Sequence, residues 1–333
     1  MVLLTLPLDC RSSEHHPITE PPLILPVPVK PANAAWWPQS VWLAPLLPID
    51  PPQIGTSKTM SSDSPDGLPP LRDVINRLGL RAKRSFGQNF LLDLNLTQRI
   101  AGAAGDLSGV NVIEIGPGPG GLTRALMLQG ASQIYAIERD FRCVDAINEI
   151  VATYPGRVHI IEADATKINL SEVCEGPRKI VANLPYNVAT PLLISWLKNL
   201  PDVQGMTLMF QKEVADRLTA QPRTKTYGRL SVMSQWLCHV RQEFNVAKEA
   251  FTPPPKVTST VVTLTPREEP LAEATWANLE QITATAFNQR RKMLRVSLKS
   301  YNFDFDALGL KETARAEELS VEDFCKLARQ IST

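Results

Sequence analysis

The sequence predicts an α/β fold with a parallel, doubly wound sheet and a small helical domain at the C-terminus. A short β-branched run ends at a glycine-rich turn, and strand-like and helix-like segments then alternate from about residue 110 to residue 182. Strands and helices that alternate at this spacing are typical of a parallel sheet with crossover helices. Past about residue 270 the pattern becomes helical, and a chain of 333 residues is long enough for one large core and a small second domain.

The first sixty residues differ from the rest of the chain because proline repeatedly interrupts their apolar runs. The run Leu23–Leu25 is too short to span a bilayer, and no basic segment leads into an unbroken apolar core, as it would in a secretory signal. We therefore interpret residues 1–66 as a disordered extension. A further hypothesis is that translation begins at Met60, because a helix-like pattern starts soon after it. A peptide from residues 1–59 in the native protein would refute this hypothesis.

The α/β domain is expected to span residues 67–267, and the helical domain residues 268–333. The β-branched run 110–115 predicts the first strand of the sheet, and residues 122–129 predict a helix that Gly130 ends. The elements expected after it are a strand at 134–137, a helix at 141–153, and strands at 158–161, 179–182 and 258–264.

The turn after the first strand has the composition of a nucleotide-binding loop. Gly116, Gly118 and Gly121 fit the pattern G-x-G-x-x-G, in which glycine lets the backbone approach a ligand closely. Glu138 ends the second strand, where an acidic residue can bind ribose hydroxyls. A nicotinamide dinucleotide site has the same spacing, so the pattern by itself leaves an oxidoreductase open.

Three details favour S-adenosylmethionine over a dinucleotide. Glu114 precedes the glycines and gives E-x-G-x-G, while Pro117 and Pro119 remove amide donors that a pyrophosphate would need. Asp164, at the end of the third strand, can reach the adenine amine of a bound nucleoside. Glu138 and Asp164 could each cap a neighbouring helix instead, but acids in register at successive strand ends favour a nucleoside.

The fourth strand ends in Asn183, Leu184, Pro185 and Tyr186, at the edge where α/β sheets bind ligands. The exocyclic amine of a base is a poor nucleophile because its lone pair is delocalised into the ring. Hydrogen bonds from the amine to the Asn183 side-chain carbonyl and the Leu184 main-chain carbonyl would direct that lone pair toward a methyl donor. Pro185 would fix the turn and the Tyr186 ring would stack on the base, so that alignment drives the reaction without a covalent intermediate. The alternative is an ordinary loop, in which such turns and aromatic residues are common.

Five segments together resemble the KsgA/RsmA family of ribosomal RNA adenine dimethyltransferases. The resemblance runs from about Leu68 to the C-terminus. The asparagine-led segment, residues 183–187, is shared by many amino-methylating enzymes. Residues 83–91 and the proline-rich residues 251–257 are together much more specific to this family. The segments are residues 83–91, 114–118, 183–187, 227–231 and 251–257.

The resemblance implies a Rossmann-like class I methyltransferase that uses S-adenosylmethionine. It implies N6-dimethylation of two adjacent adenines in a hairpin near the 3′ end of small-subunit (16S) rRNA, during ribosome biogenesis. It also places Phe251 on the target adenine, opposite Tyr186; without the resemblance, a core phenylalanine ahead of the last strand is an equally good interpretation. The implied cofactor-binding residues are Asn89, Leu91, Gly116, Gly118, Glu138, Asp164 and Asn183.

Two runs of basic residues contain no acid and are candidates for phosphate contacts with RNA. Phe287, Leu294 and Leu298 predict that the second run lies on one helix with an apolar stripe. A solvated helix face is the better interpretation for any single basic residue, whereas the cluster favours RNA. The candidate residues are Arg223, Lys225 and Arg229 in the first run, and Arg290, Arg291, Lys292 and Arg295 in the second.

The composition argues against several other kinds of site. The five cysteines are far apart and form no C-x-x-C pair, which suits a reducing cytoplasm and argues against disulfides or structural zinc. The four histidines show no metal-ligand spacing. We therefore expect no metal and no membrane partner, and a monomer that acts on the rRNA of an assembling 30S-type ribosomal particle.

Three other functions remain open at this point. A nicotinamide-dependent oxidoreductase would leave residues 183–186 and the basic runs unexplained. An RNA-binding assembly factor could have kept the fold and lost catalysis, although the intact segment 183–186 argues against it. A related large-subunit rRNA adenine methyltransferase of the antibiotic-resistance type is the third possibility, against which the loop at Phe251 and the C-terminal basic run favour the small-subunit enzyme.

Overall fold

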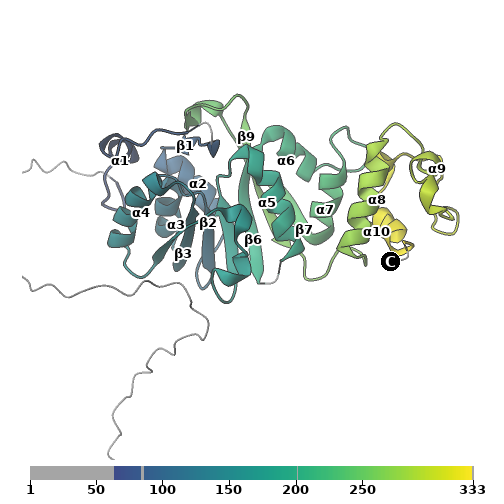
Figure 1. Cartoon of the computed structure of the whole chain (residues 1–333), viewed down its shortest axis with the longest axis horizontal. Helices are drawn as coiled ribbons and strands as arrows, with labels where there is room; N and C mark the ends of the chain where they lie inside the picture. Colours follow the sequence, from purple (N-terminus) through teal and green to yellow (C-terminus); the bar gives the residue numbers. More distant parts are fainter. Residues whose placement is uncertain (1–63, 84–85, 201, 332–333) are drawn as a thin grey trace, which may run out of the picture. The chain divides into compact units, whose positions relative to one another are not determined.

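Contacts between residues divide the chain into two units, Met1–Thr59 and Met60–Thr333. The computed structural model describes residues 64–83, 86–200 and 202–331, all within the second unit (Figure 1). The predictions for residues 1–63, including a start of translation at Met60, lie outside the described residues and stay predictions.

The centre of the described chain is a seven-stranded sheet with the order β4-β3-β2-β5-β6-β9-β7. The strands from β2 to β6 are parallel, as the sequence predicts, whereas β9 runs antiparallel between β6 and β7. This departure arises because residues 247–258 turn the chain back on itself instead of crossing the sheet. The strands are β2 (Asn111–Ile115), β3 (Gln133–Glu138), β4 (Val158–Glu162), β5 (Arg178–Ala182), β6 (Val203–Gln211), β7 (Cys238–Val246) and β9 (Ser259–Pro266).

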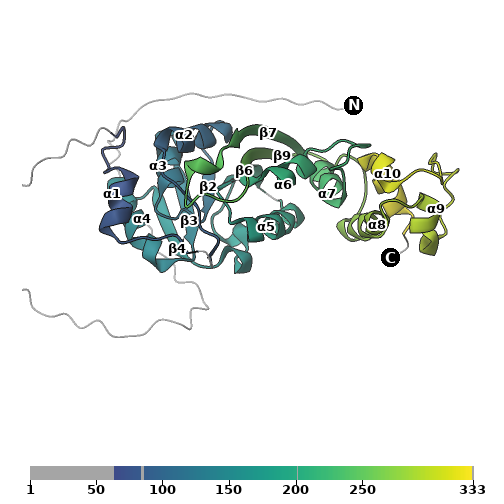
Figure 2. The ribbon, with the colours of Figure 1, turned by 90° about the horizontal axis from the view of Figure 1, so that it is seen from above.

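Helices cover both faces of the sheet because neighbouring residues of each strand point to opposite faces. In β2, Val112 belongs to the core formed with α2, α3 and α4, while Ile113 belongs to the core formed with α5 and α6. Figure 2 shows α2 and α3 on one side of the strands and α5 on the other. No helix among the described residues is long and apolar enough to cross a membrane. The helices from residue 71 to residue 237 are α1 (Leu71–Arg77), α2 (Leu94–Ala103), α3 (Gly121–Leu128), α4 (Phe141–Thr153), α5 (Tyr186–Lys198), α6 (Lys212–Leu218) and α7 (Arg229–Leu237).

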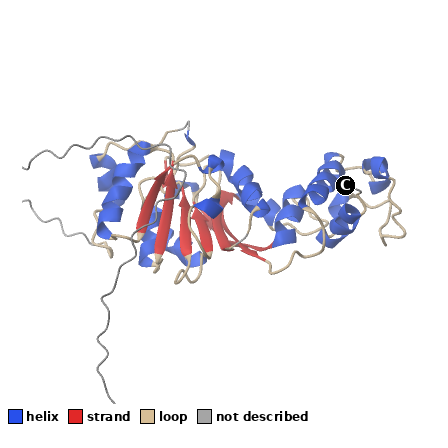
Figure 3. Cartoon of the chain, turned by 60° about the horizontal axis from the view of Figure 1, so that its bottom comes forward, coloured by secondary structure: helices blue, strands red, loops and turns tan. Residues whose placement is uncertain are grey.

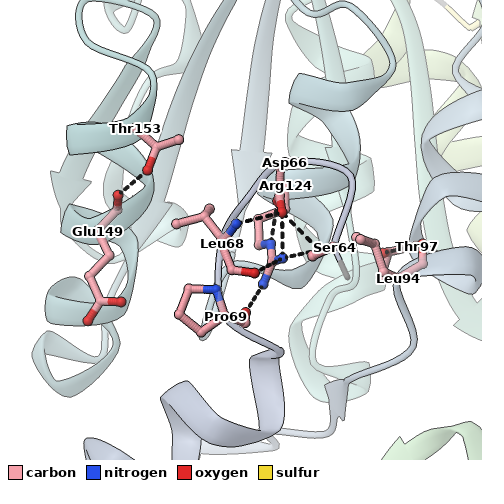
Figure 4. A network of polar contacts seen from close by, with 9 residues as sticks. All are labelled: Ser64, Asp66, Leu68, Pro69, Leu94, Thr97, Arg124, Glu149 and Thr153. Carbon is pink, nitrogen blue, oxygen red and sulfur yellow. Dashed lines mark hydrogen bonds and ion pairs between the residues drawn. The ribbon is translucent and has the colours of Figure 1, made fainter. Parts of the chain in front are cut away.

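A buried ion pair ties the first described residues to α3, the helix that follows the glycine turn (Figure 4). Arg124 Nε lies 2.6 Å from Asp66 Oδ2, and the two side chains are 4% and 0% exposed. The guanidinium also donates to the main-chain carbonyl of Pro69 and to the hydroxyl of Ser64. Removing one partner of such a buried pair leaves an uncompensated charge, which costs about 3–5 kcal/mol. Residues 64–66, which the sequence assigned to the extension, are therefore part of the folded unit.

A second, two-stranded sheet joins segments that are far apart in the sequence. Strand β1 (Phe90–Leu91) pairs antiparallel with β8 (Phe251–Thr252), and Leu91 lies opposite Phe251. The pairing connects a residue expected at the cofactor with a residue expected at the target base.

The C-terminal helices share an apolar core with α7, and Figure 3 shows this end of the chain as helix and loop. Val232 and Trp236 of α7 pack in the same cluster as Leu279 and Phe324. The packing therefore crosses the predicted domain boundary after residue 267, and that boundary stays a prediction. The helices are α8 (Trp276–Asn288), α9 (Leu294–Ser297) and α10 (Val321–Arg329).

The single helix predicted to carry Phe287, Leu294 and Leu298 is wrong. Helix α8 ends at Asn288 and α9 begins at Leu294, since the backbone leaves the helical region at Gln289 (φ −118°, ψ 56°) and is extended at Met293 (φ −65°, ψ 152°). Met293 forms a β-bridge with a residue outside these helices, which breaks the helical hydrogen bonding. The three apolar residues still belong to one cluster, so the predicted stripe is folded around a bend.

Candidate active site

A cavity of about 250 Å³ opens at the carboxyl ends of the parallel strands. The strand order reverses between β2 and β5, and open α/β sheets bind ligands in the crevice at such a switch point. The cavity brings together the glycine turn, the two acidic strand ends and the asparagine-led segment. The predicted site residues that line it are Asn89, Leu91, Gly116, Gly118, Glu138, Asp164, Asn183, Leu184, Pro185 and Tyr186.

Gly118 and Gly121 of the turn leave little room for a side chain next to residues 86–91. Gly118 has φ 56°, and a Cβ there would lie 3.3 Å from the ring of Phe90. A Cβ on Gly121 would lie 2.7 Å from the carbonyl oxygen of Leu91. Glycine therefore allows residues 86–91, which we call the β1 segment, to pack directly on the turn.

Glu138 is buried, and main-chain amides hold its carboxylate. Oε2 accepts from the amide of Gly118 at 2.9 Å, and Oε1 accepts from the amides of Arg139 and Asp140 at 2.8 and 2.7 Å. Burial raises the pKa of Glu138, and these amide bonds oppose that rise. The residue that caps α4 is Asp140. Glu138 thus has a fixed position in the cavity wall, and Oε2, with one main-chain bond, keeps a lone pair for a ligand hydroxyl.

Glu114 is 1% exposed, and neither of its carboxylate oxygens has a hydrogen-bond partner among the described residues. Burial raises the pKa of Glu114 to about 8, against a weaker opposing effect of Thr123, whose hydroxyl lies close without reaching hydrogen-bond geometry. A buried carboxyl without a partner is costly unless a ligand compensates it. A positively charged ligand group would favour the ionised form of this carboxyl and a negatively charged one would oppose it, so the wall suits a sulfonium or ammonium group better than a pyrophosphate.

Asp164 caps the 3₁₀ helix η2 (Ala165–Lys167), as the alternative interpretation of the sequence proposed. Oδ1 accepts from the hydroxyl and the amide of Thr166 at 2.7 and 3.0 Å, and these bonds lower the pKa of Asp164. Nη1 of Arg139 lies 3.5 Å from Oδ2. Since Asp164 also lines the cavity, capping does not exclude a contact with adenine, and that contact stays a prediction.

The side chain of Asn183 is oriented by the main chain of the β1 segment. Its Nδ2 donates to the carbonyl oxygen of Asn89 at 3.2 Å. Because the oxygen and nitrogen of a planar amide point apart, this bond directs Oδ1 away from Asn89. The turn after Asn183 is fixed from the same side, since a Cβ on Gly87 would lie 3.1 Å from Cβ of Pro185. The tip of β5 thus presents an amide carbonyl oxygen in the wall of the cavity.

The two aromatic residues expected at the target base differ in their positions. Tyr186 begins α5, is half-buried and lines the cavity. Phe251 is 2% exposed, packs in the core with Leu91 and Val261, and does not line the cavity. In this structure Phe251 is the core phenylalanine of the alternative interpretation, because β8 pairs with β1. Contact of Phe251 with a base stays a prediction.

Two polar residues that were not among the predicted site residues hold the β1 segment in place. Gln88 accepts from the amide of Lys83 and donates to Asp140 Oδ2, both at 2.9 Å. Asp140 is 1% exposed and is also bonded to Arg142. Gln88 lies inside a segment that carries the resemblance, but its partner on α4 is distant in the sequence and only the fold reveals it.

The two basic runs meet in the structure. Nη2 of Arg290 donates to the main-chain carbonyl of Thr224 at 3.3 Å, and Nε of Arg290 lies 2.8 Å from a carboxylate oxygen of Glu317. The main-chain carbonyl of Glu317 accepts from the amide of Arg223 at 2.6 Å. Glu317 therefore joins both runs. We define the basic surface as Arg223, Lys225, Arg290, Arg291 and Lys292.

Acids that are distant in the sequence neutralise part of the cluster. Arg229 pairs with Glu280 at 2.7 Å, and Arg295 pairs with Glu312 at 3.0 Å. Within the described part of the chain, no ion pair is formed by the side chains of Arg223, Lys225, Arg291 or Lys292. The second run thus contains no acid along the chain, but acids from elsewhere in the sequence lie beside two of its arginines in the fold.

The cysteines Cys143, Cys174, Cys238 and Cys325 are buried and unbridged. Among the described residues, no group of three or more histidine, cysteine or acidic side chains could hold a metal ion.

Comparisons with known proteins agree with this geometry. The sequence model of the family described as ribosomal RNA adenine dimethylase matches residues 79–333. A protein of Paramagnetospirillum magneticum named ribosomal RNA small subunit methyltransferase A is 60% identical over 267 residues, which cover 79% of this chain and 95% of the relative. A protein of the same name from Rhodospirillum rubrum is 59% identical over 270 residues, with coverage of 80% and 93%.

Solved structures support the same fold. A dimethyladenosine transferase from Plasmodium falciparum aligns with a TM-score of 0.63 at 26% identity, covering 71% of this chain and 94% of that one. The 23S rRNA methyltransferase ErmE aligns with a TM-score of 0.58 at 27% identity, covering 73% and 99%. The fold is that of a class I methyltransferase, and the chain spans most of the length of each of these relatives. The chain is a methyltransferase that belongs to the ribosomal RNA adenine dimethylase family.

Proposed function

We propose that this enzyme dimethylates the N6 amines of two adjacent adenines in a hairpin near the 3′ end of small-subunit rRNA. The observation that carries the proposal is the amide of Asn183, which lies at the tip of β5 in the same cavity as the glycine turn and Glu138. The relatives from P. magneticum and R. rubrum are named for the small ribosomal subunit, which supports this substrate over a large-subunit RNA.

The cofactor would be S-adenosylmethionine, which supplies a methyl group activated by a sulfonium. The carboxylate of Glu138 would accept bonds from the ribose hydroxyls, and Asp164 would accept one from the adenine amine. The carboxyl of Glu114 would face the positive charges of the methionine part. Asn89 and Leu91 of the β1 segment would complete the wall on the other side of the glycine turn.

The residues of strand β5 would orient the target amine. Oδ1 of Asn183 would accept one N6–H and the main-chain carbonyl of Leu184 the other, which moves the nitrogen lone pair out of conjugation with the ring. Pro185 holds the turn and Tyr186 would stack on the base. Positioned acceptors of this kind act by alignment and charge placement, so no nucleophilic side chain is required.

The same acceptors explain how a second methyl group could follow the first. A monomethylated amine keeps one N–H, so a single carbonyl oxygen can still hold it in place. The second transfer therefore needs room for one methyl group and no further polar residue.

RNA would be held by the basic surface, whose unpaired cations can contact phosphates. We further propose that the enzyme acts as a monomer in the cytoplasm on an assembling 30S-type particle, without a metal and without a membrane partner. The exposed side chains of Arg291 and Lys292 and the family membership support the RNA contact.

The test is mass spectrometry of nucleosides from small-subunit rRNA of a strain that lacks this protein. We expect N6-dimethyladenosine to be lost, to return with the wild-type chain, and to stay absent with Asn183→Ala. Unchanged dimethyladenosine in the deletion strain would overturn the substrate. Calorimetric titration with S-adenosylmethionine and with NAD tests the cofactor separately, and binding of NAD alone would overturn it.

A further inference from the structure

A hydrogen bond links the cavity wall to the interior of the sheet. The hydroxyl of Tyr186 lies 2.6 Å from Oγ of Ser259. Ser259 is 0% exposed and begins β9, where it pairs with Gln211 of β6 on one side and Val246 of β7 on the other. Tyr186 lines the cavity and Ser259 does not. The bond therefore anchors a ring of the site to a residue that no ligand in the cavity touches.

Ser259 is a rigid anchor because strands flank it on both sides and its side chain is short. The main chain of Tyr186 is fixed by the first turn of α5, so the remaining freedom of the ring lies in its side-chain torsions. A tyrosine oxygen lies on the axis about which the ring flips, so a bond to this oxygen fixes the direction of the ring. Burial raises the pKa of Tyr186, which keeps its hydroxyl protonated and able to share the bond.

We infer that Ser259 is a positioning residue for adenine methylation, which holds the ring of Tyr186 in the place where the target base stacks. The inference rests on the proposed function, in which Tyr186 stacks on adenine. Ser259 acts through Tyr186 alone, so its loss should misplace the base and leave the cofactor wall unchanged.

The chain offers a matched control in the next residue of the same strand. Thr260 is also 0% exposed, and its hydroxyl donates to Oδ1 of Asn245 at 2.8 Å, away from the cavity. Thr260→Val therefore removes a comparable buried hydrogen bond without touching Tyr186. A loss of stability alone should affect Ser259→Ala and Thr260→Val alike.

The first experiment measures methylation of 30S particles, purified from a strain that lacks this protein, by Ser259→Ala, Tyr186→Phe and the double variant. We expect each single variant to lower kcat by about three- to tenfold, the range of one hydrogen bond, with KM for S-adenosylmethionine unchanged. The double variant should be no slower than the singles, because all three lack the same bond. Thr260→Val should keep the wild-type kcat.

The second experiment observes the base without turnover. A hairpin with 2-aminopurine at the target adenine is titrated with each variant, and we expect the stacking-dependent quenching in the wild type and in Thr260→Val to weaken in Ser259→Ala. Tyr186→Phe supplies the same readout should Ser259→Ala fail to fold. The inference is overturned if Ser259→Ala matches Thr260→Val in both kcat and quenching. If the wild-type chain itself fails to methylate the 30S particles, the proposed function is overturned first.

Discussion

The acidic wall of the cavity and the basic surface hold their charges in opposite ways. Glu138 is buried, and main-chain amides fix its carboxylate. Arg291 and Lys292 are exposed, and the neighbouring Arg290 pairs with an acid. Buried charges interact through a low dielectric, whereas exposed charges are screened by water and salt. Substitutions in the cavity should therefore have large effects on methylation that do not depend on salt concentration. Substitutions on the basic surface should have small effects on RNA binding that do depend on it.

The largest effect is expected at the carbonyl oxygen of the cavity wall. Asn183→Ala should lower the single-turnover rate of methylation on the order of 10²- to 10³-fold, because a positioned acceptor is lost in a water-poor site. The fold-change should be the same at low and high salt. Asn169→Ala, which removes an exposed asparagine elsewhere in the chain, serves as the control. A loss of less than tenfold would show that Asn183 is not the acceptor.

The second effect concerns the pH dependence of stability. The pKa of Glu114 rises from 4.5 to about 8 on burial, so between these values the folded state keeps a proton that the unfolded state has released. The stabilising contribution of neutral Glu114 is therefore complete below pH 4.5 and is lost as the pH rises toward 8. Each unit of pKa shift corresponds to about 1.4 kcal/mol, so the total is on the order of a few kcal/mol.

Glu114→Gln removes this dependence while keeping the shape of the side chain. Without cofactor, the Tm of the variant relative to the wild type should increase from pH 5 to pH 8. Glu162→Gln, at an exposed acid that ends β4, serves as the control. Parallel curves of Tm against pH for the wild type and Glu114→Gln would contradict the prediction.

Local patterns predicted the cavity well because its parts have local causes. The first strand was expected at 110–115 and is β2 at Asn111–Ile115, since a β-branched run ends where glycine allows a sharp turn. Glu138 ends β3 and Asp164 follows the end of the neighbouring parallel strand β4, so the alternation of strands and helices was enough to bring both acids into one crevice. The parallel strands could thus be predicted from local sequence patterns, without information on contacts between distant residues.

The remaining features depend on contacts that no local pattern records. Ser259 bonds to Tyr186 across the end of the sheet, and Glu317 joins two basic runs from outside both. The helix predicted through Met293 is broken, and that residue forms an isolated β-bridge with Arg315 instead. Phe251 is buried because β8 pairs with β1. In each case a contact between residues that are far apart in the sequence determined the structure, and no local sequence pattern could have predicted that contact.

The smallest effects are expected on the basic surface, where a measurement can most directly contradict the expected difference in salt dependence between the two regions. Arg291→Ala and Lys292→Ala should each weaken binding of the rRNA hairpin by about two- to fivefold and reduce the salt dependence of log Kd by about one unit, as expected for one phosphate contact. Arg295→Ala should leave the salt dependence unchanged, because the charge of Arg295 is already paired with Glu312. Fluorescence anisotropy at several salt concentrations measures both quantities. Arg72→Ala is the control, because Arg72 is exposed on α1 and forms no ion pair within the described part of the chain. An equal loss there would mean that RNA senses only the net charge of the protein.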